Sequence, residues 1–285
     1  MTNITALIDA SVYSRSVCDH AAWLALRTGD GVDVVHVLGR REVSSAPVNL
    51  SGNLDANARD TLLAELASLD EQKAKLAHKR GRLLLDEAKA RLHEDGVDVV
   101  TTKLRNGDIV EAIHDFEDDS SFIVIGKRGE AADFASMHLG SNLERVVRAT
   151  HKPVLVAARA FKPIERFLIA YDGGASAMKA IEHVAASPAF KGLACRVLSV
   201  GSHTSGVRQQ LDEAATNLRD KAGMSVETDI VNGQPDAVIA QAVRDDQIDL
   251  VVMGAYGHSR IRSLIIGSTT TEMIRSCLVP IMLFR

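Results

Sequence analysis

Apolar and polar residues follow one another along the chain in blocks that predict strands and helices in regular alternation. Short, almost wholly apolar runs at 6–8, 122–125 and 250–253 have the length and composition of strands buried on both faces. Between such runs lie longer stretches in which apolar residues recur every three or four positions, as in amphipathic helices. This alternation predicts an α/β fold in which helices cover both faces of a parallel sheet.

The predicted elements form two series with the same order of strands and helices. The first series has strands at 3–8, 32–37, 97–104, 121–125 and 153–157, with helices at 12–28, 58–94, 108–118 and 141–150. The second has strands at 167–171, 194–200, 225–231, 249–253 and 280–284, with helices at 175–187, 206–222, 235–245 and 268–277. Each series predicts a doubly wound parallel five-stranded sheet, whose ligand crevice lies at the carboxyl ends of the strands.

Matching offsets indicate that the two series are copies of one unit. Gly140 stands 8 residues before Arg148 and 13 before Pro153, while Gly267 stands 8 before Arg275 and 13 before Pro280. An aspartate, Asp9 or Asp172, follows the first strand of each copy. We therefore predict tandem domains at 1–158 and 166–285, with residues 159–165 as the linker.

The first copy is longer than the second. From Asp9 to Asn106 is 97 residues, whereas from Asp172 to Asn232 is 60, so the first copy holds about 37 more. The surplus falls within 40–96, as a polar loop followed by a long leucine-rich helix. We interpret this helix as an ordinary surface helix, with an interaction surface as the alternative.

Composition and charge narrow the picture by exclusion. With 46% hydrophobic and 25% charged residues, the chain is typical of folded proteins rather than disordered ones. A net charge of −4 offers no electrostatic footprint for nucleic acid or an acidic membrane. No apolar run approaches the roughly 18–20 residues of a membrane helix, and Asp9 interrupts the stretch where a signal peptide would be apolar.

The cysteines favour a reducing compartment. Cys18, Cys195 and Cys277 are far apart, odd in number and free of CxxC spacing, so neither a disulfide framework nor a zinc site is expected. We interpret them as buried free thiols of a cytoplasmic protein.

The glycine-rich stretch after 250–253 is the best candidate for chemistry. Gly254 and Gly257 let the backbone turn sharply and approach a ligand closely. Gly267, Ser268 and Thr269 then open a helix whose free N–H groups favour anions such as phosphate.

Further side chains of this stretch could assist binding. Thr270 could add a hydroxyl donor, and His258, Arg260 and Arg262 could add positive charge. Because neither GxGxxG after the first strand nor GxxxxGK[ST] occurs, the usual Rossmann and P-loop interpretations fail. A glycine turn followed by an N-capped helix, without any ligand, is the alternative.

The motif Gly254-x2-Gly257-x9-Gly267-Ser268 resembles the ATP-binding signature of the universal stress protein (UspA) superfamily. The first copy is similar in Asp9, in Gly126-Lys127-Arg128-Gly129 and in Gly140-Ser141-Asn142. The resemblance covers the chain apart from 40–57 and implies a tandem member with a Rossmann-like fold, similar to the adenine nucleotide alpha hydrolases. It also implies an intramolecular pseudo-dimer in which 154–158 pairs with 281–284, while homodimerisation and a regulatory protein partner stay open.

The resemblance further implies a nucleotide site in each copy, with ATP as the ligand and Mg²⁺ as its optional companion. In the second copy the implied binding residues are Asp172, Val200, Gly254, Gly257, His258, Gly267, Ser268 and Thr269. In the first copy they are Asp9, Val37, Gly126, Lys127, Gly129, Gly140, Ser141 and Asn142. Ten residues rather than nine separate the last two glycines of the first copy, and Ala10 replaces Gly173, so the second copy is the primary expected site.

No catalytic set or metal cluster accompanies these positions. Neither GxSxG nor HExxH occurs. We interpret His183, His203 and His258 as surface or loop residues, and His20, His36 and His114 as packing residues. Asp172 is the conspicuous carboxylate of the second site, which allows at most a slow ATPase.

The expected function is therefore that of a stress-response protein with a regulatory or protective ATP-binding module. Two alternatives stay open. The first is a slow ATP-hydrolysing or nucleotidyl-transferring enzyme, and the second is a non-nucleotide scaffold that binds another small molecule.

Overall fold

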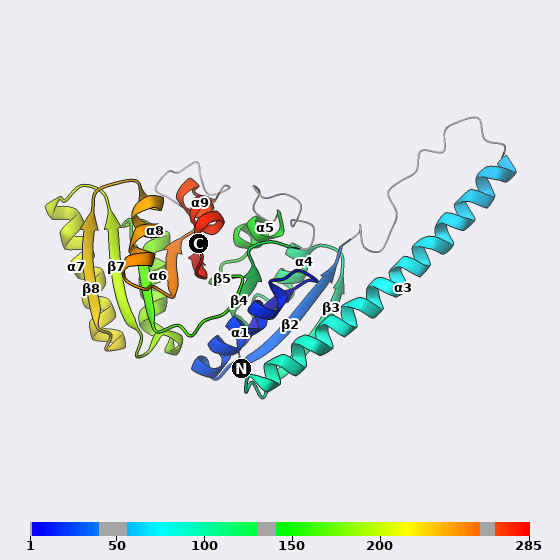
Figure 1. Cartoon of the computed structure of the whole chain (residues 1–285), viewed down its shortest axis with the longest axis horizontal. Helices are drawn as coiled ribbons and strands as arrows, with labels where there is room; N and C mark the ends of the chain where they lie inside the picture. Colours follow the sequence, from blue (N-terminus) through cyan, green and yellow to red (C-terminus); the bar gives the residue numbers. More distant parts are fainter. Residues whose placement is uncertain (1, 40–55, 130–140, 257–265) are drawn as a thin grey trace.

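The computed structural model describes residues 2–39, 56–129, 141–256 and 266–285, and Figure 1 shows their arrangement. We call residues 1–158 the first half and residues 166–285 the second half. The first half contains β1 (Asn3–Ile8), α1 (Ser14–Thr28), β2 (Gly31–Leu38), α3 (Ala56–Glu94), β3 (Val100–Asn106), α4 (Ile109–His114), β4 (Ser120–Gly126), α5 (Ser141–Ala149) and β5 (Val154–Ala157).

The second half repeats this order, with an α7 of 18 residues where α3 has 39. It contains β6 (Arg166–Ala170), α6 (Ala175–Ala186), the 3-10 turn η2 (Pro188–Phe190), β7 (Ala194–Val200), α7 (Ser205–Ala222), β8 (Val226–Val231), α8 (Pro235–Asp245), β9 (Leu250–Gly254), α9 (Ser268–Ser276) and β10 (Ile281–Phe284). Every predicted strand and helix is present. The prediction missed η2, began β3 three residues too early and extended α4 past His114.

The ten strands form one sheet in the order β3-β2-β1-β4-β5-β10-β9-β6-β7-β8. Strands within each half are parallel, which confirms the predicted α/β class and the doubly wound order. The halves join where β5 and β10 run antiparallel, with Leu155 opposite Met282. This pairing is the predicted pseudo-dimer contact, and it removes two edges that would otherwise be open to other strands.

Two hydrophobic cores lie on opposite faces of the sheet. Strand residues alternate between them: Ile4, Ala6 and Ile8 belong to one core, while Leu7 belongs to the other. The first core is covered by α1, α3, α6 and α7, and the second by α4, α5, α8 and α9. Burial on both faces explains why the strands are continuous apolar runs.

Helix α3 extends far beyond the sheet that its last turns cover (Figure 1). Its buried apolar side chains are Leu85, Ala88 and Leu92, all near the carboxyl end. Gly81 marks the point of closest approach, because a Cβ there would lie 2.7 Å from Leu104 Cδ1 and 3.0 Å from His36 Cδ2. Among the described helices, α3 included, none is both long and apolar enough to span a membrane.

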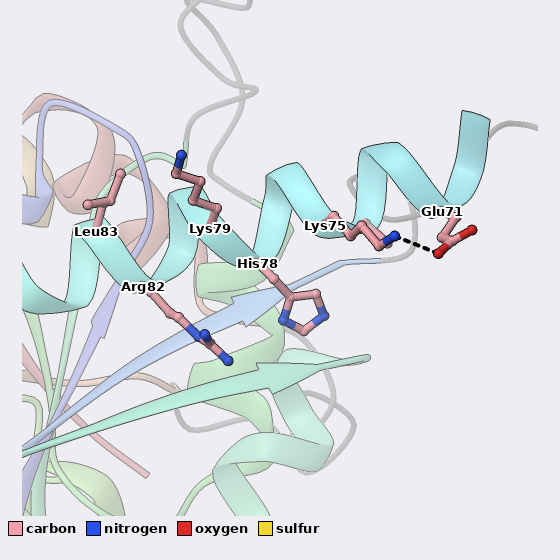
Figure 2. A pocket seen from close by; sticks show the side chains of 7 residues that line it. Glu71, Lys75, His78, Lys79, Arg82 and Leu83 are labelled. Atoms are coloured by element: carbon pink, nitrogen blue, oxygen red, sulfur yellow. Dashed lines mark ion pairs between the residues drawn. The ribbon is translucent and has the colours of Figure 1, made fainter. Parts of the chain in front are cut away.

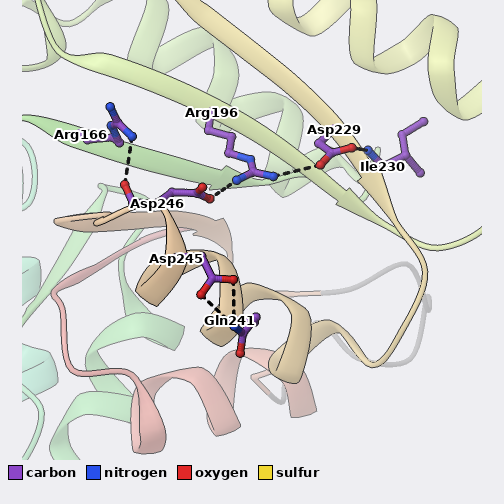
Figure 3. A network of polar contacts seen from close by, with 7 residues as sticks. All are labelled: Arg166, Arg196, Asp229, Ile230, Gln241, Asp245 and Asp246. Carbon is purple, nitrogen blue, oxygen red and sulfur yellow. Dashed lines mark hydrogen bonds and ion pairs between the residues drawn. The ribbon is translucent and has the colours of Figure 1, made fainter.

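The halves carry the same partly buried ion pair with its charges reversed. In the first half Lys103 of β3 lies 2.9 Å from Asp33 of β2. In the second half Arg196 of β7 lies 2.9 Å from Asp229 of β8, and it also binds Asp246 at the end of α8 (Figure 3). Since Asp33 and Arg196 hold corresponding positions in the strands next to β1 and β6, the two copies keep the pair but exchange its signs.

Side chains also cross between the halves. The ring of His183 on α6 lies 5.1 Å from Phe122 of β4 and 5.2 Å from Phe284 of β10. The guanidinium of Arg27 on α1 donates to the backbone carbonyls of Ala189 and Lys191. The halves are therefore joined through packed side chains as well as through the sheet.

Candidate functional site

Strand register gathers the predicted residues of the second half at one edge of the sheet. Ala170 of β6 pairs with Leu198 of β7 on one side and with Met253 of β9 on the other. Asp172 and Val200 each lie two residues beyond this row, and Gly254 lies one residue beyond it. After β6 the chain adds β7 and β8 on one side of that strand and then β9 and β10 on the other. The carboxyl end of β6 is therefore a topological switch point, where doubly wound folds place their ligands.

Asp172 occupies the turn between β6 and α6. Its side chain is exposed, and its Oδ1 accepts a hydrogen bond of 2.9 Å from the backbone N–H of Gly174. Gly173 has a φ of +75°, a left-handed conformation that glycine adopts without strain. The carboxylate thus both shapes the turn and stands at the sheet edge.

Asp9 accepts the equivalent hydrogen bond in the first half, although the residue after it has a different backbone conformation. Its Oδ1 accepts 2.9 Å from the N–H of Ser11, and Ala10 has no positive φ. Its Oδ2 would lie 3.0 Å from a Cβ on Gly129. Two of the predicted first-half residues, Asp9 and Gly129, are therefore neighbours, and the Ala10 departure leaves the hydrogen bond to the aspartate intact.

The glycines at the ends of β4 and β9 have a packing reason of their own. A Cβ on Gly254 would lie 2.9 Å from Ser176 Cβ, and one on Gly126 would lie 2.6 Å from Tyr13 Cβ. In both halves the first helix therefore begins in direct contact with the glycine backbone. No pattern in the sequence marks Ser176 or Tyr13 as the contacting residues.

Helix α9 begins close to the end of β9. The N–H of Gly267 donates to the carbonyl of Ala255 at 3.0 Å, and the hydroxyl of Thr270 lies 3.1 Å from the carbonyl of Gly254. Gly267 is the N-cap and supplies no side-chain hydrogen bond to the helix. Ser268 is exposed and Thr269 half-buried, so the start of α9 presents polar groups beside the sheet edge.

Thr270 differs from its predicted role as a phosphate donor. It is buried, and its hydroxyl is committed to the carbonyl of Gly254. It serves to tether α9 to β9, a function that its position in a Ser-Thr-Thr run does not reveal.

Lys127 also lies elsewhere than a phosphate site would require. Its side chain is buried, and its ammonium donates to the carbonyl of Cys277 in the second half. Burial lowers the pKa of Lys127; Cys277 partly offsets this by raising it, and Arg128 lowers it further. In this structure Lys127 links the two halves.

Several predicted positions lie outside the described residues. These are Gly140, Gly257, His258, Arg260 and Arg262, together with the side chain of Ser141. Of the other first-half positions, Asn142 is exposed in the first turn of α5, and Val37 is half-buried near the end of β2. Val200 is half-buried at the equivalent place on β7.

The histidines divide into packing and surface residues, with two differences from the prediction. His20 and His36 are buried, and His203 is exposed, as expected. His114 is exposed rather than packed, and His183 is half-buried between the halves rather than on the surface.

The described side chains offer neither a metal cluster nor a reactive thiol. Over residues 2–39, 56–129, 141–256 and 266–285, no group of three or more His, Cys, Asp or Glu side chains could hold a metal ion. Cys18, Cys195 and Cys277 are buried free thiols, as predicted. Burial raises the pKa of Cys18 and of Cys195 to about 12, which keeps both in the unreactive thiol form.

Two parallel five-stranded units with the doubly wound strand order place the chain in the class of tandem doubly wound α/β proteins. Residues 1–158 and 201–285 match the universal stress protein family. Universal stress protein Slr1230 of Synechocystis sp. is 36% identical over 288 residues, which cover 100% of both chains. The chain therefore belongs to the universal stress protein family, a family of stress-response proteins.

Solved structures share the fold over the whole chain. A universal stress protein from Archaeoglobus fulgidus has a TM-score of 0.72 at 21% identity, covering 99% of this chain and 98% of that one. The protein PA1789 from Pseudomonas aeruginosa, described as functionally unknown, has a TM-score of 0.60 at 14% identity, covering 100% and 92%. At such identities the likeness concerns the fold alone.

Proposed function

We propose that this stress-response protein binds ATP at the sheet edge of its second half and acts as a regulatory binding module. The observation that carries the proposal is the convergence of Asp172, Val200, Gly254 and the start of α9 on one topological switch point. The spacing of Gly254, Gly257 and Gly267, which resembles the family's ATP-binding signature, supports the same ligand.

Each part of this edge suits one part of the nucleotide. The α9 N-terminus has an N-cap without a side-chain hydrogen bond, so its N–H groups and positive dipole end are suited to phosphate oxygens. Ser268 and Thr269 would add hydroxyls beside them. The exposed carboxylate of Asp172 would accept hydrogen bonds from ribose hydroxyls, and Val200 would pack against the adenine.

We assign a second, weaker site to the equivalent edge of the first half. Asp9 lies against Gly129 there, and Gly126 ends β4, the strand paired with β1. We propose domains at 1–158 and 166–285 as the units that carry the two sites. Lys127 has no part in this proposal, because its ammonium already binds Cys277. Mg²⁺ would arrive with the nucleotide phosphates, since the described residues do not build a metal site of their own.

Binding would act by linkage rather than by chemistry. A ligand stabilises whichever state binds it better, and ATP would join the β6–α6 turn to the start of α9. The buried free thiols suit a protein that works in the reducing cytoplasm. A steady turnover above roughly 1 s⁻¹, in the range of ordinary enzymes, would instead favour an ATP-hydrolysing enzyme.

The test is a pair of substitutions at the N-cap of α9. Gly267 has a φ of −58°, which other residues adopt without strain, and both Asp and Asn are good N-caps. We expect Gly267→Asp to place a carboxylate where phosphate binds and to weaken ATP binding by at least tenfold. Gly267→Asn offers a similar side chain without the charge and should retain more of the affinity.

The measurement combines calorimetric titration with ATP–Mg²⁺ and thermal shift. Both variants should unfold at or above the temperature of the parent protein, because a capping side chain stabilises the helix by a few tenths of a kcal/mol relative to glycine. Equal ATP affinity in the parent and the Asp variant would contradict the site. If acid-quenched parent protein released no adenine nucleotide and ATP–Mg²⁺ caused no thermal shift, the binding proposal itself would fail.

A further inference from the structure

The outer part of α3 carries a row of leucines that the fold of its own half does not use. Leu62, Leu69, Leu76 and Leu83 follow one another at intervals of seven residues. The last three are 51%, 68% and 61% exposed. We call these four residues the leucine row. Figure 2 shows Leu83 on the side of α3 away from His78 and Arg82, which project on the side of β2 and β3.

The spacing of the leucine row is that of a coiled-coil seam. Residues seven apart on a helix lie nearly above one another, and leucine sustained over three heptads is typical of helices that pair. The row spans 21 residues, about 32 Å at 1.5 Å per residue. The buried residues of α3, Leu85, Ala88 and Leu92, lie on a different side of the helix and nearer its end, so the row is additional to the core face.

Charge along the same helix is strongly divided. Residues 60–71 carry no basic side chain and four acidic ones: Asp60, Glu65, Asp70 and Glu71. Residues 72–85 carry no acidic side chain and five lysines and arginines: Lys73, Lys75, Lys79, Arg80 and Arg82. Two such helices attract each other along their length when they run antiparallel, because each acidic segment then faces a basic one.

The a positions of the heptad, which alternate with the leucine row along the seam, also favour an antiparallel pair. In the heptad that places the row at d, the a positions are Arg59, Leu66, Lys73 and Arg80. A parallel pair would set Lys73 against Lys73 and Arg80 against Arg80 at the centre of the seam. An antiparallel pair sets each of these cations beside a leucine and close to the acidic segment of the other helix.

We infer that the outer part of α3 is a dimerisation arm, which binds the same arm of a second copy of this chain as an antiparallel coiled coil. The arm comprises residues 59–83, and its axis of symmetry lies near residue 71. In this register Leu66 packs against Leu76 of the second copy, and Glu65 lies near Lys79 of the second copy. This dimerisation is separate from the proposed nucleotide binding and does not depend on it.

The oligomeric state tests the arm directly. We expect analytical ultracentrifugation of the full chain to show a dimer of about twice 30.7 kDa at tens of micromolar. The double variant Leu69→Asp/Leu76→Asp should raise the dimer dissociation constant by at least about 100-fold, since buried charge at central seam positions removes the main apolar contacts. Circular dichroism should show the fold retained, because these side chains are exposed in the single chain.

Neighbouring residues provide the matched control. Leu69→Asp and Ser68→Asp add the same charge one residue apart, but Ser68 lies off the seam. Only the leucine variant should weaken the dimer. A parent protein that stays monomeric at about 100 μM, or a dimer that both variants leave unchanged, would overturn the inference.

Cysteine cross-linking tests the orientation. A mixture of the single variants Leu66→Cys and Leu76→Cys should form a disulfide-linked dimer on mild oxidation, because these positions face each other in the antiparallel register. Leu76→Cys alone should not, since the two copies of residue 76 lie ten residues, about 15 Å, apart along the axis. Efficient cross-linking of Leu76→Cys alone would show a parallel pair and contradict the assignment; the three native cysteines are buried and do not interfere.

Discussion

At the scale of single residues, His183 makes the stability of the contact between the two halves depend on pH. Its ring packs between Phe122 of the first half and Phe284 of the second. Its buried Nε2 has no hydrogen-bond partner within the part of the chain that the structure describes. Burial lowers the pKa of His183 from 6.5 to about 4, so the folded protein keeps the ring neutral at pH values where an unfolded chain would protonate it.

The sign of the pH effect follows from that difference. Between pH 6.5 and about 4 the unfolded state binds the extra proton, so the free energy of unfolding decreases as the pH falls through this window. From pH 7 to pH 4.5 the loss should be about 2–3 kcal/mol for His183. Burial also lowers the pKa of His20 to about 4, so His20 should contribute a loss with the same sign.

Denaturant unfolding at pH 7 and pH 4.5 measures this effect. His183→Leu should lose less stability over the interval than the parent, by about 2–3 kcal/mol. His203→Leu, at an exposed position, should follow the parent. If the His183 variant lost as much stability as the parent, the ring would not be the neutral, buried group that the structure indicates.

The same scale shows which site residues a sequence can indicate and which it cannot. The neighbouring positions of Asp172 and Gly254 could be predicted because strand ends meet at one edge of a parallel sheet, and the register confirms these positions. Thr270 and Lys127 were misjudged because each points to a backbone carbonyl, of Gly254 and of Cys277. A residue type and its spacing carry no information about which way the side chain turns.

At the scale of elements, the contact of α3 with the sheet depends on Gly81. Replacing Gly81 with leucine would drive a side chain into His36 and Leu104, and such overpacking costs about 1–3 kcal/mol. Gly81→Ala should be nearly neutral, because the gain in helix propensity, about 1 kcal/mol, offsets a small shift of the flexible Leu104 end. Chemical denaturation of the variants measures both values.

Ala67 supplies the control for this prediction. It lies two heptads before Gly81 on the same side of α3, but at an exposed position beyond the sheet. Ala67→Leu should therefore change the free energy of unfolding by less than about 0.5 kcal/mol. A comparable loss in Ala67→Leu and Gly81→Leu would mean that helix chemistry, and not contact with β2 and β3, decides the effect.

The helices and strands could be predicted because two independent patterns in the sequence agreed on them. Hydrophobic period fixed their type, and the internal repeat checked their order. The errors fall where tertiary contacts decide the boundary: β3 begins only at Val100, although Val97 is apolar and buried. The charge-reversed pairs, Asp33 with Lys103 and Arg196 with Asp229, could not be predicted, since their pairing depends on the diagonal register of neighbouring strands.

At the scale of the whole molecule, the continuous sheet makes the two halves one cooperative unit. They share the β5–β10 pairing and a core that contains residues of both, and Lys127 and Arg27 add polar contacts across the junction. Unfolding one half would expose the apolar surface of the other. We therefore expect the halves to unfold together rather than as independent domains.

The single tryptophan allows this coupling to be measured from one side. Trp23 lies on α1 in the first half and packs against the shared core, so its fluorescence reports the first half. Ile230 is buried on β8, the outermost strand of the second half. Ile230→Ala should remove about 2–5 kcal/mol of stability. In a cooperative molecule the Trp23 transition should move to lower denaturant by the same amount as the circular dichroism of the whole chain. A Trp23 midpoint that stayed in place while the circular dichroism split into two steps would show that the β5–β10 junction joins the halves in space without joining their folding.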